Sequence, residues 1–267
     1  MGASVNDVSD EPLLLKSIED GIARVTLNRP TQYNALSIQM LSELQTMLRE
    51  IGDSEAVRVV VLAARGKAFC AGHDLKEMRS SEDREFHRAL FQQCAQMMQT
   101  IAQLPQPVIA EVNGIATAAG CQLVAQCDLA VASEVSRFAV SGINLGLFCS
   151  TPAVPLSRNM PRKQAMHMLL TGDFIDAEHA LQFGLINAVA AVDEIETVTL
   201  ELAQKIAARS PLAIQMGKRA FYQQLNMGLE NAYALAADTM ACNLDSEDAR
   251  EGIDAFIDKR KPVWRGR

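Results

Sequence analysis

The sequence has no long hydrophobic run, since none approaches the ~20 consecutive apolar residues that a membrane-spanning helix needs. It also lacks the composition of a disordered chain, because 49% of its residues are hydrophobic and only 21% are charged. The length of 267 residues is close to the upper size at which one hydrophobic core serves a single domain. We therefore expect one globular domain with no membrane-embedded part.

Cysteine and histidine are present without the spacings that bind metals. The six cysteines form no CxxC pair, and the four histidines show no ligand spacing. Scattered cysteines of this kind are typical of reduced, buried thiols in a reducing compartment. We therefore predict no metal site.

Positive charge is scarce, because 25 basic residues against 32 acidic ones give a net charge of −7. Such a chain repels phosphate backbones unless its cations are concentrated on one face, so we expect no nucleic-acid partner. The first fifteen residues contain three acidic residues and no Lys or Arg, unlike a targeting peptide. These features predict a cytoplasmic protein.

Strand and helix patterns alternate along the first part of the chain. The strands are predicted at residues 13–18, 22–27, 57–62 and 108–112. One helix is predicted from the apolar spacing that starts at Leu36, with Ser37 as its N-cap, and another over residues 84–104. This alternation predicts an α/β fold with parallel strands joined by right-handed crossovers. Beyond residue 150 the pattern is mostly helical, with Ser210 and Ser246 as expected N-caps. We divide the chain into a flexible N-terminus (1–11), an α/β core (12–200) and a C-terminal helical region (201–267).

Two glycine-containing loops each follow a predicted strand. The first is KAFCAGHDL (residues 67–75), and the second is NGIATAAGCQL (residues 113–123), which leads directly into a helix. Glycine lets the backbone approach a ligand closely, and the free N–H groups at a helix N-terminus favour negative charge. Two such loops can aim amides at one oxygen, although either loop alone is also compatible with a tight strand-to-helix turn. GxGxxG and P-loop motifs are absent, so no phosphate cradle is predicted.

The order of four motifs resembles the crotonase (enoyl-CoA hydratase/isomerase) family. These are AFCAGHDL, PVIAEVNGIATAAGCQLVAQCDLAVAS, FAVSGINLGL and LLTGDFIDAEHALQFGLIN, followed by EGIDAFIDKRKPVW. The sequence is most similar to the branch described as enoyl-CoA hydratase domain-containing proteins. The resemblance implies a spiral of ββα units with a C-terminal helical trimerisation region. It also implies an oxyanion hole that polarises a thioester carbonyl with the backbone N–H groups of His73 and Ala119. The His73 imidazole is expected to line the pocket or pack.

The resemblance further implies acyl-CoA as the small-molecule substrate, with CoA belonging to the substrate and no other cofactor. The CoA-binding positions in the core would be Ala35, Leu36, Ala71, Asp74 and Leu75. Phe256 and Lys259 match positions that reach CoA from an adjoining subunit, although a core Phe and a solvated Lys are equally compatible with the sequence. A homotrimer or a hexamer built as a dimer of trimers is implied.

The sequence departs from the family's hydratases at both acid–base positions. Where those enzymes carry two glutamates, this chain has Gln122 and Gly142. A neutral amide orients water or a substrate oxygen but takes no proton at neutral pH. Asn144 is our candidate for a hydrogen bond to substrate or water. Glu111 and Asp128 are expected to be structural carboxylates.

Three functions remain open at this point. The first is an acyl-CoA enzyme that uses the oxyanion hole for decarboxylation, hydrolysis or isomerisation, with weak or no classical hydration. The second is a non-catalytic acyl-CoA-binding protein. The third, RNA binding, is known for one branch of the family, and the acidic net charge argues against it here.

Overall fold

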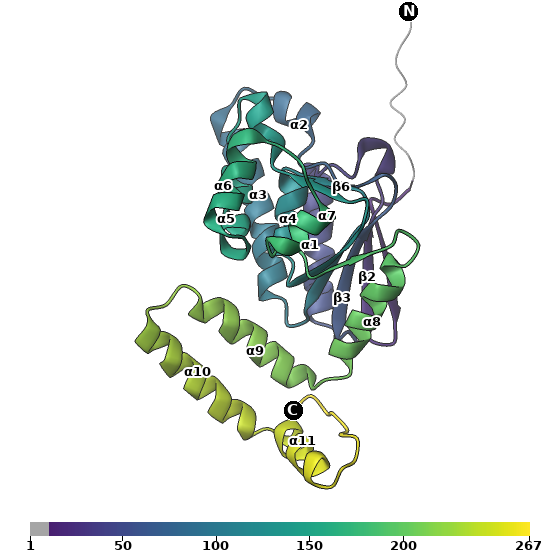
Figure 1. Ribbon diagram of the computed structural model, residues 1–267, viewed down its shortest axis with the longest axis vertical. Coiled ribbons are helices and arrows are strands. Elements are labelled where there is room, and N and C mark those ends of the chain that lie inside the picture. The colour runs from purple at the N-terminus through teal and green to yellow at the C-terminus, as the bar shows by residue number, and fades with distance from the viewer. Residues whose placement is uncertain (1–10) are drawn as a thin grey trace, which may run out of the picture.

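The computed structural model describes residues 11–267 and shows two β-sheets flanked by helices, from which a C-terminal helical arm projects (Figure 1). All but one residue of the predicted flexible N-terminus lies outside the described residues. The larger sheet has the strand order β1-β2-β3-β5-β7-β10. Its strands are β1 (Leu14–Glu19), β2 (Ile22–Leu27), β3 (Val59–Ala64), β5 (Val108–Val112), β7 (Leu129–Ser133) and β10 (Ala188–Ala190).

The larger sheet is parallel apart from its first hairpin. β1 and β2 pair antiparallel, as predicted, and β2 to β10 run parallel. Side chains of β3 alternate between two hydrophobic clusters, because successive residues of a strand point to opposite faces. Val60 and Leu62 join the main core, and Val59 and Val61 join the cluster under α8 (Ile195–Ala207). Burial on both faces explains why β3 is an unbroken apolar run.

A smaller sheet carries short strands that follow the long ones in the chain. Its order is β4-β6-β8-β9, formed by β4 (Ala68–Cys70), β6 (Ile115–Thr117), β8 (Arg137–Ala139) and β9 (Ile175–Asp176). β4 follows β3, β6 follows β5, and β8 follows β7, each pair leading into helix. This succession is the spiral of ββα units that the resemblance implied. The sequence patterns did not predict the short strands, because three residues are too few to show a period.

Three helices begin directly after a serine whose side chain accepts a hydrogen bond from the first turn. Ser37 caps α1 (Ile38–Gly52) by accepting from Met40 N at 3.1 Å. Ser210 and Ser246 cap α9 (Pro211–Gln224) and α11 (Glu247–Ile257), as predicted. The other helices of the core are α2 (Leu75–Arg79), α3 (Arg84–Gln103), α4 (Ala119–Gln126), α5 (Ser150–Asn159), α6 (Arg162–Thr171) and α7 (Ala177–Gln182). Short 3₁₀ turns are η1 (Pro30–Gln32) and η2 (Ser141–Leu145). No helix among residues 11–267 is both long and apolar enough to cross a bilayer.

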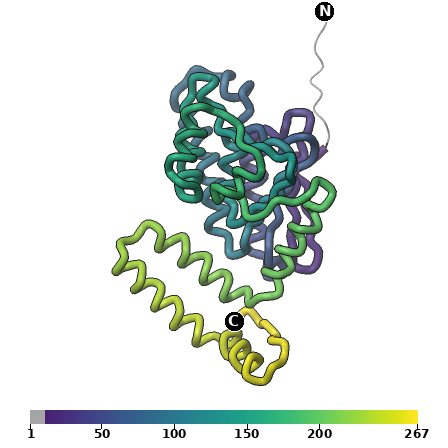
Figure 2. Tube along the Cα trace, in the orientation of Figure 1, coloured from purple at the N-terminus to yellow at the C-terminus, as the bar shows by residue number. Residues whose placement is uncertain are grey.

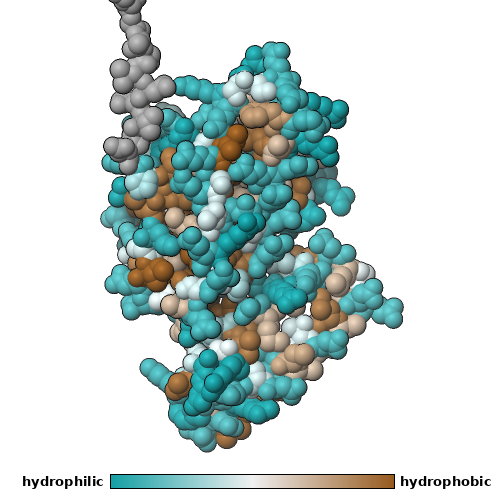
Figure 3. Space-filling view, turned by 180° about the vertical axis from the view of Figure 1, so that it is seen from behind, coloured by the Kyte–Doolittle hydropathy of each residue, from teal (hydrophilic) through white to brown (hydrophobic). Residues whose placement is uncertain are grey.

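The arm consists of α9 (Pro211–Gln224), α10 (Leu229–Leu244) and α11 (Glu247–Ile257), and it lies apart from the core (Figure 2). The expected core boundary at residue 200 falls inside α8, whose residues pack on the larger sheet, so the arm begins only with α9. No residue of α9 or α10 is buried. Hydrophobic side chains, brown in Figure 3, are exposed on the arm.

One partly buried polar network anchors the arm to the core. Lys218 Nζ on α9 donates to Asp128 Oδ2 (2.6 Å) and to the carbonyl oxygens of Ile101 and Gln106 (2.9 Å each). Tyr222 donates its hydroxyl proton to Asp128 Oδ1 at 2.8 Å. Burial lowers the pKa of Lys218, and the neighbouring Asp128 carboxylate partly offsets this. Asp128 is therefore structural, as the sequence indicated.

Candidate active site

The first loop turns sharply after β4 at Ala71, Gly72 and His73. Gly72 has φ +95°, a conformation that side chains rarely adopt. Its carbonyl accepts from Leu36 N at 2.7 Å, which fixes the peptide that bears the His73 N–H. Asp74 then caps α2 through a 2.9 Å bond from Lys76 N to Oδ1. The loop is thus held on both sides of His73.

The second loop runs from β6 into α4. The first bond that closes α4 runs from Gln122 N to the Ala118 carbonyl at 3.0 Å, which leaves the Ala119 N–H without an acceptor inside the helix. Ala119 itself has no positive φ. The positive φ falls instead on the preceding residue, Ala118, with φ 51° and ψ −120°.

The two loops are in van der Waals contact. A Cβ atom added to Gly72 would lie 2.9 Å from Ala118 Cβ and 3.1 Å from Ala119 N. A Cβ on Gly120 would lie only 2.0 Å from the Cys70 carbonyl oxygen. The start of α4 is therefore pressed against the end of β4, and the peptides of His73 and Ala119 come from touching segments.

The His73 side chain is buried beside the first loop. Its ring meets Phe91 edge to face, with centroids 5.4 Å apart, and neither ring nitrogen has a hydrogen-bond partner in the part of the chain that the structure describes. The Leu36 carbonyl faces the ring without reaching hydrogen-bond geometry. Burial lowers the pKa of His73, so the imidazole is neutral at pH 7. It packs, as expected, rather than pairing with a carboxylate.

Gln122 lies in the first turn of α4, three residues after Ala119, so both face the same side of the helix. Its side chain is 3% exposed, and its Oε1 has no partner among residues 11–267. An unpaired buried acceptor costs stability, which makes it a group to explain. The amide supplies no proton transfer.

Gly142 occupies a closed position in η2. A Cβ atom there would lie 2.6 Å from Cys149 Sγ and 2.8 Å from the Leu147 carbonyl oxygen. The Gly142 N–H also donates to Cys149 Sγ at 3.3 Å. Burial raises the pKa of the Cys149 thiol, so it is neutral and packs instead of acting as a nucleophile. No side chain fits at residue 142 without moving this turn.

Asn144 lies two residues further along η2 and is exposed. A Cβ on Gly172 would lie 2.9 Å from Asn144 Nδ2, so the amide rests beside the end of α6. The structure does not bring it to the two donor loops through any hydrogen bond. Its contact with substrate or water stays a prediction.

The remaining carboxylates that the sequence offered are engaged elsewhere. Glu111, 7% exposed, forms a two-pronged ion pair with Arg24 on the larger sheet, and Asp128 anchors the arm. Glu77 accepts from Ile38 N at 2.8 Å. Within residues 11–267 no cluster of three His, Cys, Asp or Glu side chains is arranged to hold a metal ion.

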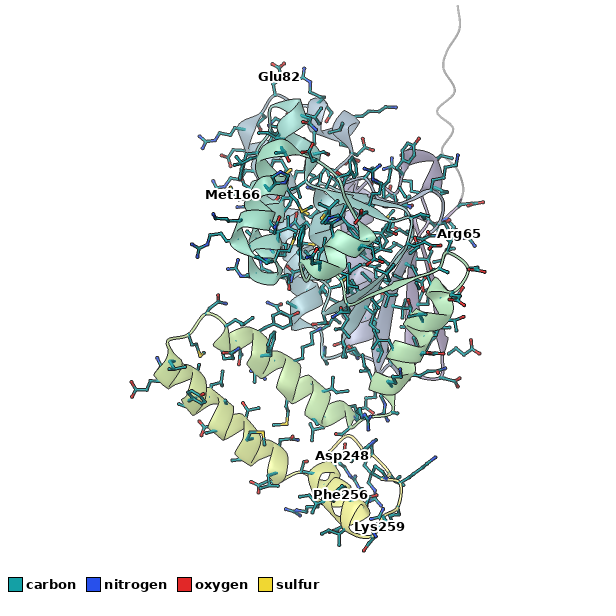
Figure 4. All side chains as sticks on the ribbon, viewed as in Figure 1. Arg65, Glu82, Met166, Asp248, Phe256 and Lys259 are labelled. Carbon is teal, nitrogen blue, oxygen red and sulfur yellow. The ribbon has the colours of Figure 1, made fainter. Side chains whose placement is uncertain are left out.

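The residues assigned to CoA fall into two groups. Ala35, Leu36, Ala71, Asp74 and Leu75 all lie at or next to the first loop, where Leu36 bridges to His73 and Asp74 pairs with Arg29 at 3.1 Å. Phe256 and Lys259 lie at the far end of the arm (Figure 4). Phe256 is 86% exposed, so it is not a core residue of this chain. Within one chain the two groups are not brought together.

Two features of the site escaped the sequence interpretation. One is the positive φ of Ala118, and the other is the contact by which Cys149 fills the space beside Gly142. An alanine where a turn needs glycine gives no signal in a single sequence. The contact of Cys149 with Gly142 depends on how η2 folds back and is likewise invisible in the pattern.

Comparison with known proteins gives a consistent result. The family model described as enoyl-CoA hydratase/isomerase matches residues 17–267. The chain is 48% identical over 246 residues to mouse "Enoyl-CoA hydratase domain-containing protein 3, mitochondrial", covering 92% of this chain and 82% of that protein. The mouse protein's name does not agree with the cytoplasmic location expected from this sequence.

Solved structures show the same similarity. The crystal structure of an enoyl-CoA hydratase from Mycobacterium smegmatis matches with 54% identity and a TM-score of 0.93, covering 95% of this chain and 99% of that one. Human enoyl coenzyme A hydratase domain-containing protein 3 matches with 46% identity and a TM-score of 0.92, covering 95% and 100%. The α/β fold predicted from the sequence is thereby confirmed.

Proposed function

Because the chain belongs to the enoyl-CoA hydratase/isomerase family, we propose that it binds acyl-CoA thioesters and polarises the thioester carbonyl with the backbone N–H groups of His73 and Ala119. The support is the contact between the two loops, in which Gly72 lies against Ala118 and Ala119 N. Fixed amides at a helix N-terminus stabilise an enolate or tetrahedral oxyanion, and losing one donor typically costs about 3 kcal/mol of barrier.

The chemistry proposed is one that needs enolate or oxyanion stabilisation without an acid–base pair from the protein. Hydration of a 2-enoyl thioester requires a water to be deprotonated and a proton to be delivered. Gln122 does neither, and the Gly142 position is closed by Cys149 and the Leu147 carbonyl. Decarboxylation, hydrolysis or isomerisation with an acid or base on the substrate itself fits this site. The blocked Gly142 position is the observation that carries the proposal.

The test is a side-by-side assay. We expect the purified chain to hydrate crotonyl-CoA far more slowly than a two-glutamate family hydratase at equal concentration. Turnover is then followed over a panel of acyl-CoA esters that includes malonyl, 3-enoyl and saturated acyl groups. Hydration equal to that of the two-glutamate enzyme would contradict the roles given to Gln122 and Gly142.

A non-catalytic acyl-CoA-binding protein is the second candidate. It is favoured by the engagement of Glu77, Glu111 and Asp128 with partners of their own, which leaves these three carboxylates unsuited to replace the glutamates. Binding of CoA esters without turnover across the panel would distinguish it from the enzyme. No binding of any ester would contradict both candidates.

We also propose that the arm assembles the chain into homotrimers or dimers of trimers. Large apolar side chains on α10 and α11 are exposed, including Leu229, Tyr233, Met240 and Phe256 at 69–86%. Exposed apolar surface of this extent on an unpartnered arm is typical of an interface. In such an assembly Phe256 and Lys259 would reach CoA on an adjoining subunit. Light scattering should give a trimer or hexamer mass, and Tyr233→Asp with Met240→Asp should lower it.

A further inference from the structure

Ala118 has a backbone conformation that suits glycine. Five non-glycine residues within 11–267 have positive φ, and four of them are Asp20, Tyr33, Asn34 and Lys259. Ala118 is the fifth, and its ψ of −120° lies outside the small left-handed region that other side chains tolerate. An unfavourable backbone conformation persists only where the surrounding structure enforces it.

Hydrogen bonds hold Ala118 on both sides. Its N–H donates to the Ala139 carbonyl at 3.0 Å, and its own carbonyl accepts from Gln122 N at 3.0 Å. The Thr117 hydroxyl bonds the Ser141 hydroxyl at 2.8 Å, which ties the same turn to η2. The residue therefore cannot rotate to a relaxed conformation without breaking the start of α4 or its contact with β8.

The methyl group of Ala118 lies against the other donor loop. A Cβ on Gly72 would be 2.9 Å from Ala118 Cβ, so the methyl already fills the space beside Gly72. Glycine at residue 118 would adopt the same φ without penalty but would leave this space empty. Alanine thus lowers the stability of the turn while setting how closely the two loops approach.

We propose that Ala118 is a positioning residue whose methyl group, held between the two loops, fixes the spacing and direction of the His73 and Ala119 N–H groups. The inference rests on the proposed function, since it needs a carbonyl that both amides bind. It separates two properties that usually change together: removal of the methyl should make the fold more stable and the carbonyl site weaker.

The experiment compares the full-length chain with Ala118→Gly, using butyryl-CoA that is isotope-labelled at the thioester carbonyl. This saturated ester can be neither hydrated, isomerised nor decarboxylated, so hydrolysis is the one reaction to monitor, by the release of free CoA thiol. Infrared difference spectra report how far the carbonyl stretch is lowered on binding, and calorimetry reports the dissociation constant. Thermal unfolding without ligand reports the stability.

For Ala118→Gly we expect the melting temperature to rise by about 2–4 °C, because the backbone strain is relieved. We expect the lowering of the carbonyl frequency to shrink and binding to weaken about tenfold, less than the loss of a whole donor. Ala118→Ser keeps a Cβ and should retain the frequency shift of the native chain. Ala125→Gly, inside α4 with ordinary φ, is the matched control and should only lower the melting temperature.

The other results overturn the inference. An unchanged frequency and affinity in Ala118→Gly would show that the methyl does not position the donors. A lower melting temperature would show that the turn is not strained. If the native chain binds butyryl-CoA without lowering its carbonyl frequency, or does not bind it, the proposed function itself fails and this inference with it.

Discussion

The donor loops and the acid–base positions of the candidate active site are built differently. In the donor loops the proposed functional atoms are main-chain N–H groups, held by segments that touch at Gly72, Ala118 and Ala119. At the two positions compared above with the glutamates of the hydratases stand Gln122, which has no partner for Oε1 among residues 11–267, and Gly142, which is closed in by Cys149. The proposed carbonyl binding depends on backbone contacts, whereas proton transfer would depend on side chains, so the two can be tested separately.

The largest effect is expected for Gly72→Ala, which changes the contact between the two donor loops. The new Cβ would meet Ala118 and would stand at φ +95°, so we expect a loss of about 4 kcal/mol in the free energy of unfolding. Denaturant unfolding measures it. Gly146→Ala is the matched control, because Gly146 also has positive φ (+77°) but nothing lies within 4 Å of its added Cβ. Equal losses in the two variants would contradict the contact between the loops.

A second, smaller effect is expected from introducing carboxylates at both residues 122 and 142. Gln122→Glu with Gly142→Glu should cost about 3 kcal/mol, because the residue 142 side chain clashes with Cys149 Sγ and a backbone carbonyl. Crotonyl-CoA hydration should not increase. Gln122→Glu alone is the control, and it should unfold nearer to the native chain. A gain in hydration would show that the turn accommodates the carboxylate. It would contradict the closed position described for residue 142.

A third prediction concerns the unpaired amide. Gln122→Met keeps the volume and removes the buried acceptor, so the free energy of unfolding should rise by about 1 kcal/mol. The same replacement at Gln45, which donates to Thr100 Oγ1 at 3.1 Å, should lower it by a similar amount. Opposite signs in urea unfolding would support the assignment. A loss at Gln122 would show that its amide has a partner in solution.

The smallest effect is expected in the alkylation rate of Cys149. Alkylation needs a thiolate, and burial raises the pKa of the Cys149 thiol above its usual value, so less thiolate forms at about pH 8 than for a free cysteine. We expect peptide mass spectrometry to find Cys149 unmodified in the native chain and modified after denaturation. Reactivity should increase as pH rises. Rapid alkylation of the native chain would show that the Cys149 thiol is accessible, which would contradict the closed position of Gly142 beside it.

Much of this arrangement follows from local sequence. The serine caps at Ser37, Ser210 and Ser246, the alternation of strand and helix, and the two glycine loops were predicted because each depends on residues close together in the chain. The structural role of Glu111 also followed from its place in an apolar strand, and that of Asp128 from its place at the start of one.

The rest depends on contacts between distant segments. The strand predicted from Val57 begins at Val59, because Val57 N instead bonds the Ser54 carbonyl in a turn. Phe256 and Lys259 lie on an arm whose direction is set by the Lys218 and Asp128 pair, 90 residues apart in sequence. The strained Ala118 depends on a glycine loop 46 residues away, so no local pattern reveals it.

The crowding around Gly142 has a consequence for redesign. A side chain introduced there would need two adjustments at once, a smaller residue in place of Cys149 and a displaced Leu147 carbonyl. A saturation library at residue 142 alone should therefore return few well-folded variants, and libraries that vary residues 142 and 149 together should return more.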